Sequence, residues 1–330
     1  MGDNADTNHD GNGGASCKGP GRASGSFYTG EYGGVSFKPR NAIANEFQDP
    51  FCFHAYSPVT MRTNTVTVTQ NFTVGVGGCV WECGDLLRRF LVAEQQDVLK
   101  HTKTISTISK TTLPWTFLWN QTTAIELGCG TAIGALAAAA AGSKAVCATD
   151  FAHVLDAVTR ANAASNKHLG CPVALREWSW GNEEHEAEII KWIDDASTSG
   201  SANTRKTKAA KSRGDKSRTS ADLAPQTLLV LGADLAYVPE VFDKLVACLQ
   251  SLERASQARG WKFAFAFAHR PRLPAAEDLL LSLEDIFSYH AFVSSSLLDK
   301  RYQNTKYAAT TGVRIYTSKR NTPNVLLETT

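Results

Sequence analysis

A glycine turn between an apolar run and a run of small residues is the part of the sequence best suited to binding a ligand. The turn is Gly128-Cys-Gly130, and it follows the apolar stretch Ala124–Leu127. Glycines between a strand and a helix let a ligand approach the backbone closely. Asp150 follows about 20 positions later, at the end of a second strand-like run, where a carboxylate can hold ribose hydroxyls. This spacing predicts a site for a nucleoside-containing cofactor.

The glycine spacing also separates two classes of cofactor. A nicotinamide site has Gly-x-Gly-x-x-Gly, whereas here the third glycine, Gly134, comes one position late. Glu126 lies two residues before Gly128, and an acidic residue at that place is typical of S-adenosylmethionine sites. We therefore expect S-adenosylmethionine as the cofactor and keep a NAD(P)-dependent oxidoreductase as a distant alternative.

The segments that must position these residues alternate between strand and helix from residue 124 onward. Strand patterns cover residues 124–127, 144–149, 173–175, 227–231, 261–268, 288–294 and 311–316, and helical patterns cover 131–141, 153–166, 239–251 and 275–283. The run at 227–231 is fully apolar, as in a parallel strand that is buried on both faces. This alternation predicts a doubly wound α/β domain.

The segment before this domain has a different pattern. Residues 63–70 alternate Val with Thr, which is a strand signal, and we expect residues 72–76 to pair with them in an N-terminal β-hairpin. Residues 80–92 have a helical apolar face. Residues 1–30 are rich in Gly, Asn and Ser, so we expect a disordered tail, and the order of residues 31–60 stays open.

The basic charge of the chain is concentrated in one insert. The insert covers about residues 196–221, and its residues 201–220 hold seven basic side chains against one acid, a net charge of +6. The whole chain carries +2, so the remainder carries −4. We expect a disordered, solvated loop, and a nuclear-localisation or nucleic-acid patch is the alternative. Because the remainder of the chain is mildly acidic, we expect no nucleic-acid partner.

Cysteine spacing and apolar runs indicate the compartment. None of the eight cysteines has C-x-x-C spacing, and neither His54 nor His185 belongs to a metal-ligand motif, so we expect no metal site. The N-terminus lacks the apolar region of a signal peptide, and the longest apolar run, residues 132–141, is too short for a membrane span. These features predict a soluble protein without a membrane partner, located in the cytoplasm, with the nucleus left open by the insert.

Five motifs, in order, resemble those of the methyltransferase-like lysine methyltransferases, also called methyltransferase family 16. They are Gly78-Cys-Val80-Trp81 with Leu86–Leu91, Glu126-Leu-Gly-Cys-Gly130-Thr131, Thr149-Asp150 with Asn162 and Asn166, Trp180-Gly181, and Gly232-Ala-Asp234-Leu-Ala-Tyr237-Val-Pro-Glu240. Each motif is weak alone, but together they span about residues 63–316. The resemblance implies a Rossmann-like, seven-stranded class I methyltransferase fold over residues 61–330, with the β-hairpin as an N-terminal extension. Ala132 stands where the family commonly has glycine, and we expect it to be tolerated.

The resemblance also implies the roles of the site residues, at the positions that match the motifs. Trp81 lines the cofactor pocket, and Trp180 packs near the adenine. Gly128, Cys129 and Gly130 form the turn against the methionine portion, and Glu126 helps to hold the methionine end. Asp150 accepts hydrogen bonds from the ribose hydroxyls. Ala233 and Asp234 lie beside the transferred methyl group, Asp234 orients the acceptor amine, and Tyr237 shapes the acceptor channel.

The expected function is S-adenosylmethionine-dependent transfer of a methyl group to a lysine amine of a protein, by in-line displacement. We expect a monomeric enzyme, and the resemblance favours a chaperone or a translation factor as the substrate. The alternatives are a methyltransferase for a small molecule or another non-lysine acceptor, and a cofactor-binding scaffold without catalysis.

Overall fold

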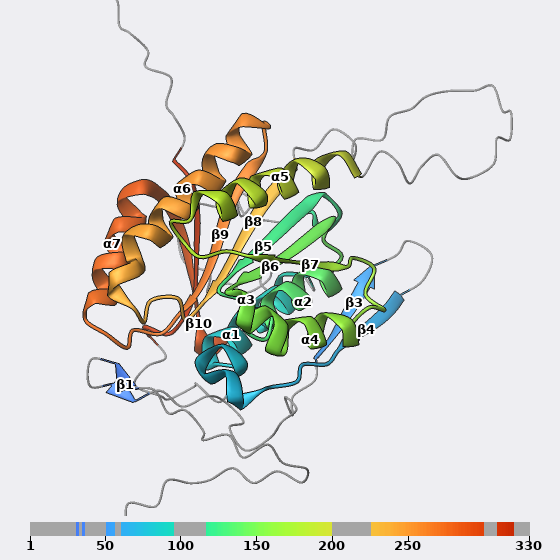
Figure 1. Cartoon of the computed structure of the whole chain (residues 1–330), viewed down its shortest axis with the longest axis horizontal. Helices are drawn as coiled ribbons and strands as arrows, with labels where there is room; N and C mark the ends of the chain where they lie inside the picture. Colours follow the sequence, from blue (N-terminus) through green and yellow to red (C-terminus); the bar gives the residue numbers. More distant parts are fainter. Residues whose placement is uncertain are drawn as a thin grey trace, which may run out of the picture.

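The computed structural model describes residues 31–32, 35–36, 51–56, 61–95, 117–199, 226–299 and 309–319 (Figure 1). The predicted tail, residues 1–30, and the basic part of the insert, residues 201–220, lie outside the described residues. The division of the chain into a tail, an extension and a domain therefore stays a prediction.

A seven-stranded sheet is the centre of the described structure. Its strands are β5 (Thr122–Leu127), β6 (Ala145–Asp150), β7 (Val173–Glu177), β8 (Thr227–Ala233), β9 (Lys262–His269), β10 (Phe287–Ser294) and β11 (Gly312–Ser318). They are arranged in the order β10-β11-β9-β8-β5-β6-β7. The first five strands along the chain are parallel, and β11 runs antiparallel to both of its neighbours.

This strand order places the ligand-binding edge. The chain passes from β5 outward through β6 to β7, then returns to β8 on the other side of β5 and continues to β9. The order therefore reverses between β5 and β8, and a parallel sheet binds ligands beyond the carboxyl ends of the strands at such a switch point. The predicted doubly wound, Rossmann-like α/β fold is confirmed, and each strand expected from residue 124 onward is present within a few residues of its predicted bounds.

Helices cover both faces of the sheet (Figure 1). One face is covered by α1 (Glu82–Gln95) and α2 (Ile133–Ala141), and the other by α5 (Glu183–Ser199), α6 (Phe242–Ala258) and α7 (Ala275–Ile286). Shorter helical segments are α3 (Ala152–Val154), η4 (Leu155–Thr159), α4 (Arg160–Ser165), η3 (Trp119–Gln121), η7 (Pro239–Val241) and α8 (Ser295–Leu298).

The side chains of the sheet explain why it is buried on both sides. In β9 the alanines at 264, 266 and 268 face α1 and α2, whereas the phenylalanines at 263, 265 and 267 face α5, α6 and α7. Helix α2 consists almost entirely of small residues and is buried along its whole length, which allows close packing on the sheet. The small side chains on one face and the large ones on the other follow the two-residue period of a strand.

The N-terminal hairpin is formed by different residues from those predicted. Its strands are β3 (Phe51–Tyr56) and β4 (Met61–Val66), which pair antiparallel. The predicted second strand, residues 72–76, is wrong, because Phe72–Gly78 is the 3-10 helix η1. Asn71 caps η1 by accepting a hydrogen bond from the Thr73 N–H, and Gly75 has a φ of 74°, which a β-strand does not use.

Strand β4 also ends earlier than predicted, because two asparagines bind the residues that follow it. The Asn166 side chain accepts from the Thr67 N–H and donates to the Thr67 carbonyl, at 3.0 and 2.7 Å. Asn162 bonds both backbone groups of Thr69 in the same way, at 2.8 and 2.9 Å. These amides therefore replace a neighbouring strand and attach the segment before η1 to α4.

Two further differences concern α5 and a short additional hairpin. The sequence patterns gave no helix at 183–199, yet α5 covers these residues and includes the first residues of the predicted insert. The residues left open at 31–60 contain, besides β3, the two-residue strands β1 (Glu31–Tyr32) and β2 (Val35–Ser36).

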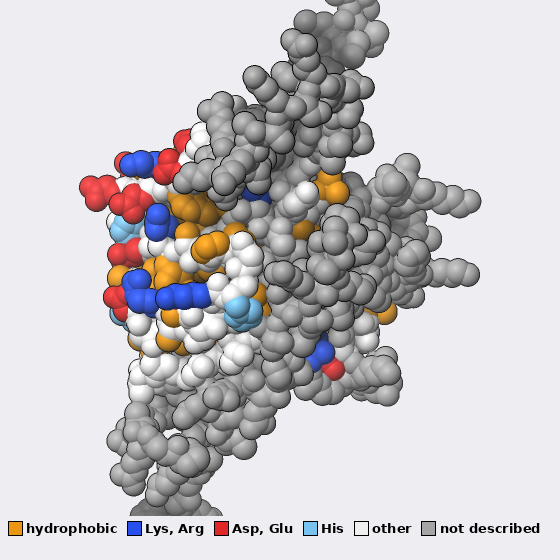
Figure 2. Space-filling view, turned by 90° about the vertical axis from the view of Figure 1, so that its right-hand side faces the viewer, with side chains coloured by type: hydrophobic (Ala, Val, Ile, Leu, Met, Phe, Trp, Pro, Cys, Tyr) orange, Lys and Arg blue, Asp and Glu red, His pale blue; other side chains and the backbone are white. Residues whose placement is uncertain are grey.

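On the face turned toward the viewer in Figure 2, the described acidic and basic side chains are interspersed, with small hydrophobic groups between them. The described part of this face therefore carries charges of both signs.

Candidate active site

The glycine turn after β5 has the backbone shape that a close-lying ligand requires. Gly128 and Gly130 have φ values of 55° and 50°, in the left-handed region. A Cβ at Gly130 would lie 2.7 Å from the Gly77 carbonyl oxygen, and a Cβ at Gly128 would lie 3.0 Å from Leu235. Both positions therefore favour glycine by conformation, and at Gly130 the backbone of Gly77 also leaves no space for a side chain. Ala132 is also left-handed, at a φ of 61°, which explains why glycine is common at this position.

The Glu126 side chain, near the end of β5, accepts two hydrogen bonds from the first turn of α2. Its Oε1 accepts from the Gly134 N–H at 3.1 Å and its Oε2 from the Ala135 N–H at 2.7 Å. Burial raises the pKa of Glu126 to about 8, although the two backbone hydrogen bonds oppose the shift. Glu126 therefore orders the start of α2, directly after the glycine turn. Its role in holding the methionine end of the cofactor stays a prediction.

Asp150 connects the end of β6 to the same turn. Its Oδ2 accepts from the Gly130 N–H and its Oδ1 from the Phe151 N–H, both at 2.8 Å. Burial raises the pKa of Asp150, and the two backbone donors oppose this shift. Phe151 is 53% exposed, an unusual position for a phenylalanine, and its ring stacks on His153 with the centroids 5.8 Å apart.

A cavity of about 540 Å³ lies at the carboxyl ends of β5, β6 and β8. It is lined by all ten predicted site residues: Trp81, Glu126, Gly128, Cys129, Gly130, Asp150, Trp180, Ala233, Asp234 and Tyr237. Volumes of this order are typical of sites for small molecules and cofactors. The structure thus brings the predicted residues together around one space, and their individual roles stay predictions.

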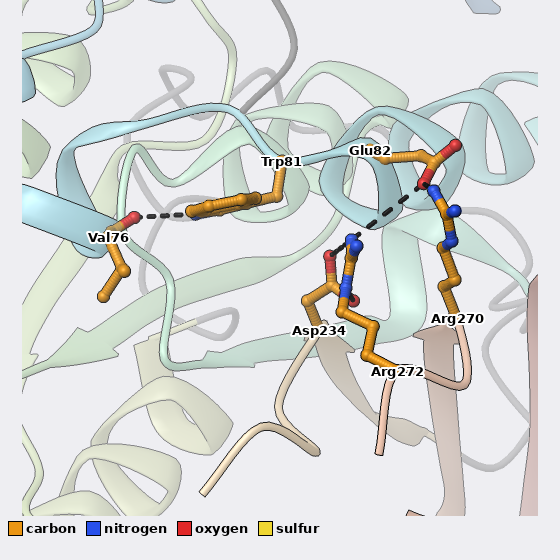
Figure 3. Close-up of polar contacts among 6 residues, drawn as sticks. All are labelled: Val76, Trp81, Glu82, Asp234, Arg270 and Arg272. Atoms are coloured by element: carbon orange, nitrogen blue, oxygen red, sulfur yellow. Dashed lines mark hydrogen bonds and ion pairs between the residues drawn. The ribbon is translucent and has the colours of Figure 1, made fainter. Parts of the chain in front are cut away.

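Trp81 and η1 form one wall of this cavity (Figure 3). The Trp81 indole N–H donates to the Val76 carbonyl at 2.8 Å, so the ring is fixed against η1. The Trp180 ring lies next to the glycine turn, since a Cβ at Gly128 would be 3.8 Å from it. Three indole rings therefore belong to the lining, Trp81 from before α1 and Trp178 and Trp180 from after β7.

Asp234 lies directly after β8 and forms an ion pair that the sequence did not predict (Figure 3). Arg272 donates from Nη2 to Asp234 Oδ2 at 2.9 Å and from Nε to Oδ1 at 3.4 Å. Burial favours the neutral acid, but the guanidinium outweighs it and holds the pKa of Asp234 below its ordinary value. The Asp234 carboxylate is thus charged, fixed and already paired.

Tyr237 is placed near both carboxylates of the cavity. Its side chain is 38% exposed and lines the cavity beside Ala233 and Asp234. Burial, with the Asp150 and Asp234 carboxylates, raises the pKa of its phenol, so Tyr237 is neutral at physiological pH and serves as a hydrogen-bonding wall.

Sequence reasoning missed Arg272 and Glu82 as part of the site. Arg272 was indicated only by its nearness to the end of β9, and Glu82 only by its position after Trp81. Nothing in the sequence shows that they approach each other, because their contact depends on how α1 packs beside β8 and β9.

The described residues contain neither a cluster of metal ligands nor a helix that could span a membrane. No group of three or more His, Cys, Asp or Glu side chains is arranged to hold a metal ion in these ranges. Every helix there is too short or too polar to traverse a lipid bilayer.

The sheet order and the glycine turn, with acidic residues at the ends of β6 and β8, define a class I methyltransferase fold. A family model described as lysine methyltransferase matches residues 61–194, which confirms the resemblance to methyltransferase family 16 that the motifs indicated. Fold and family together support S-adenosylmethionine-dependent methylation.

Other comparisons add little to this assignment. A solved structure with some likeness is the precorrin-6y C5,15-methyltransferase of Geobacter metallireducens GS-15, at 13% sequence identity and a TM-score of 0.29, covering 60% of this chain and 80% of that chain. A search of curated proteins found no significant match.

Proposed function

We propose that this chain transfers a methyl group from S-adenosylmethionine to a lysine side-chain amine of a protein substrate. The observation that carries the proposal is the single cavity that joins the Gly128–Gly130 turn and Asp150 to Asp234 and Tyr237. One half has the backbone approach and the carboxylate that a nucleoside-bearing cofactor needs. The other half has a charged carboxylate and aromatic walls, which suit the passage of an amine.

The residues present fit the cofactor. The carboxylate of Asp150 would accept hydrogen bonds from the ribose hydroxyls, the Gly128–Gly130 backbone would lie against the methionine portion, and the exposed Phe151 offers a flat apolar face beside Asp150. When bound, S-adenosylmethionine supplies a methyl group on a sulfonium, so the amine lone pair forms the C–N bond while the C–S bonding pair passes to sulfur.

The protein then has three tasks in the transfer. It must orient the amine in line with the methyl group, exclude competing water and give the released proton a way out. In-line displacement depends chiefly on positioning. We assign the orientation of the amine to Asp234 and the shaping of its channel to Tyr237, and the proton of the product ammonium passes to water. Protein lysines are the class that the family description favours, with chaperones and translation factors as the first to screen.

Calorimetric titration with S-adenosylmethionine and with S-adenosylhomocysteine tests the cofactor assignment first. Micromolar binding of both, lost in Asp150→Ala, is the expected result, and no binding of either would contradict the proposal. Transfer of labelled methyl groups into cell lysate, followed by mass spectrometry of the labelled band, tests the acceptor. Trimethyl-, dimethyl- or monomethyl-lysine is expected, whereas label on another residue or on a small molecule would refute the lysine assignment.

A further inference from the structure

Four charged side chains form a continuous network at the acceptor end of the cavity (Figure 3). Arg270 donates from Nη1 to Glu82 Oε2 at 2.6 Å, and Arg272 Nη2 lies 3.9 Å from the same oxygen. Arg272 in turn binds Asp234 through both of its oxygens. We call these four residues the acceptor-end network. It joins the start of α1, the end of β8 and the loop after β9.

The central pair of this network is withdrawn from water. The Arg272 side chain is 9% exposed and that of Asp234 is 13% exposed, while both line the cavity. The Asp234 backbone is fixed as well, because its N–H donates to the Ala268 carbonyl at 3.0 Å and its φ is 55°. A two-point contact with a guanidinium then leaves the carboxylate few orientations.

The charge of Asp234 is balanced where it lies. The titratable groups that face it are Arg272 from the loop after β9, Cys83 and Glu82 from α1, His269 from β9 and Tyr237 from its own loop. Burial lowers the pKa of His269 to about 4, and burial together with the Asp234 carboxylate raises the pKa of the Cys83 thiol, so both groups are neutral near pH 7. Arg272 is therefore the cation that compensates Asp234, and Arg270 and Glu82 compensate each other.

This balance determines how the site receives an amine. An unpaired carboxylate would stabilise the ammonium form, which has no lone pair and cannot attack a methyl group. A carboxylate whose charge is already cancelled still accepts a hydrogen bond from an amine N–H, but it stabilises the ammonium much less.

We propose that Arg272 is a positioning residue that fixes the Asp234 carboxylate in one orientation and cancels its charge, so that the acceptor amine binds in its neutral form. Glu82 holds Arg272 from the α1 side, and Arg270 neutralises Glu82. This inference rests on the proposed lysine methylation, and it assigns to Arg272 a role that does not require direct contact with the cofactor.

The test is the pH dependence of kcat in Arg272→Met, Arg272→Lys and the wild type, with a methyl-accepting substrate. The wild-type rate should rise with pH as the acceptor amine loses its proton. In Arg272→Met the carboxylate is unbalanced, so this rise should move to higher pH by about one unit. Arg272→Lys keeps the charge but not the two-point contact, so the rise should stay in place while kcat falls. Arg160→Gln, which removes an exposed arginine, should behave as the wild type.

Each outcome bears on the proposal. An unshifted profile in an active Arg272→Met enzyme would overturn it. If that variant does not fold, a shifted profile or an undiminished kcat in Arg272→Lys would overturn it instead.

Carbon-13 NMR titration of the aspartate carboxyls separates this inference from the proposed function. The Asp234 signal is identified by its absence in Asp234→Asn. It should titrate at low pH in the wild type and at higher pH in Arg272→Met, whose side chain at residue 272 is neutral. An Asp234 pKa that is equal in both would refute the charge balance whatever the substrate. A shifted carboxyl titration in an enzyme that methylates no lysine would refute the proposed function alone.

Discussion

The two ends of the cavity are held together by different kinds of interaction. At the proposed cofactor end, which is the half of the cavity around Gly128, Gly130 and Asp150, side-chain carboxyl groups bind nearby backbone N–H groups. Glu126 binds the start of α2, nine residues away, and Asp150 binds Gly130, twenty residues away. At the acceptor end, side chains bind side chains across the fold, with 38 residues between Asp234 and Arg272 and 188 between Glu82 and Arg270.

This contrast has electrostatic consequences. Glu126 has backbone N–H partners but no cation beside it, and burial, with the nearby Asp150 carboxylate, raises its pKa to about 8. Asp234 is buried against a full positive charge, which keeps its pKa below the ordinary value. Backbone donors position the Glu126 and Asp150 carboxyl groups without lowering their pKa values below the ordinary range, whereas the guanidinium of Arg272 lowers that of Asp234. The cofactor end is therefore defined by shape, and the acceptor end by charge.

The largest expected effect is on the cofactor end. Asp150→Ala removes the proposed ribose acceptor and leaves the Gly130 and Phe151 N–H groups without their partner. The two proposed hydrogen bonds from the ribose hydroxyls to the Asp150 carboxylate are lost. We therefore expect the Kd for S-adenosylhomocysteine, measured by calorimetry, to rise at least ~100-fold. Asp156→Ala, which removes an exposed aspartate near the site, should leave the Kd unchanged. Wild-type affinity in Asp150→Ala would remove the ribose assignment.

The cofactor end could be predicted from the sequence because its contacts are local. Gly128, Gly130 and Asp150 occupy fixed places in a strand–turn–helix–strand unit, so their spacing alone brings them together. The strands of the sheet were predictable for the same reason, since apolar runs and alternation report burial directly.

The acceptor end could be predicted only in part. The motif around Asp234 indicated the residue, but its partner Arg272 is found only once α1, β8 and β9 are packed. The hairpin was mispredicted because the Val and Thr alternation continues past residue 66, while the asparagines that end the strand lie about a hundred residues later in the chain. Long-range side-chain partners of this kind leave no periodic signal.

The second expected effect separates turnover from binding. In Asp234→Asn the left-handed backbone is preserved, because asparagine tolerates this region well. We expect kcat to fall about 100-fold while the Kd for S-adenosylhomocysteine stays near its wild-type value. Wild-type turnover would exclude Asp234 from the mechanism, and a loss of cofactor binding equal to that of Asp150→Ala would show that the two ends are not separable.

The same variant has a stability signature of defined sign. The folded-state pKa of Asp234 is depressed, so its pairing with Arg272 stabilises the protein above the pKa of an unfolded aspartate and is lost as the pH falls below about 4. Because the buried arginine loses its partner, Asp234→Asn should lower the free energy of unfolding by about 3 kcal/mol at neutral pH. Urea unfolding should show the full difference at pH 7 and a smaller difference at pH 3, because the contribution decreases as the pH falls from the unfolded-state pKa toward the folded-state pKa.

In Glu126→Gln the loss of unfolding free energy should be smaller than in Asp234→Asn, and it should depend on pH in the opposite direction. The folded-state pKa of Glu126 is about 8 against 4.5 in a model compound, so its stabilising contribution is complete below pH 4.5 and is lost as the pH rises through about 8. An amide offers one acceptor oxygen where two α2 N–H groups need partners, which costs about 1 kcal/mol at acid pH. The difference in free energy of unfolding between the wild type and Glu126→Gln should decrease toward pH 9. A difference that increases with pH would show that Glu126 is ionised in the folded protein, as Asp234 is.

The smallest expected effect tests whether shape alone defines the cofactor end. Ala132 is fully buried with a φ of 61°, and Ala132→Gly relieves a left-handed strain of roughly 1–2 kcal/mol. The change also removes a buried methyl group worth about 0.8 kcal/mol and adds roughly 0.4–1 kcal/mol of freedom to the unfolded chain. These contributions nearly cancel, so the free energy of unfolding should change by less than about 0.5 kcal/mol.

Ala135→Gly is the matched control for this substitution. Ala135 is equally buried but lies inside α2, where no strain is relieved, so the same loss of a methyl group should cost about 2 kcal/mol. Equal destabilisation of the two variants in urea unfolding would mean that the left-handed backbone at residue 132 stores no strain. The turn would then accept alanine at residue 132 without cost, and the strict requirement for glycine would be confined to Gly130, where the Gly77 carbonyl leaves a Cβ no room.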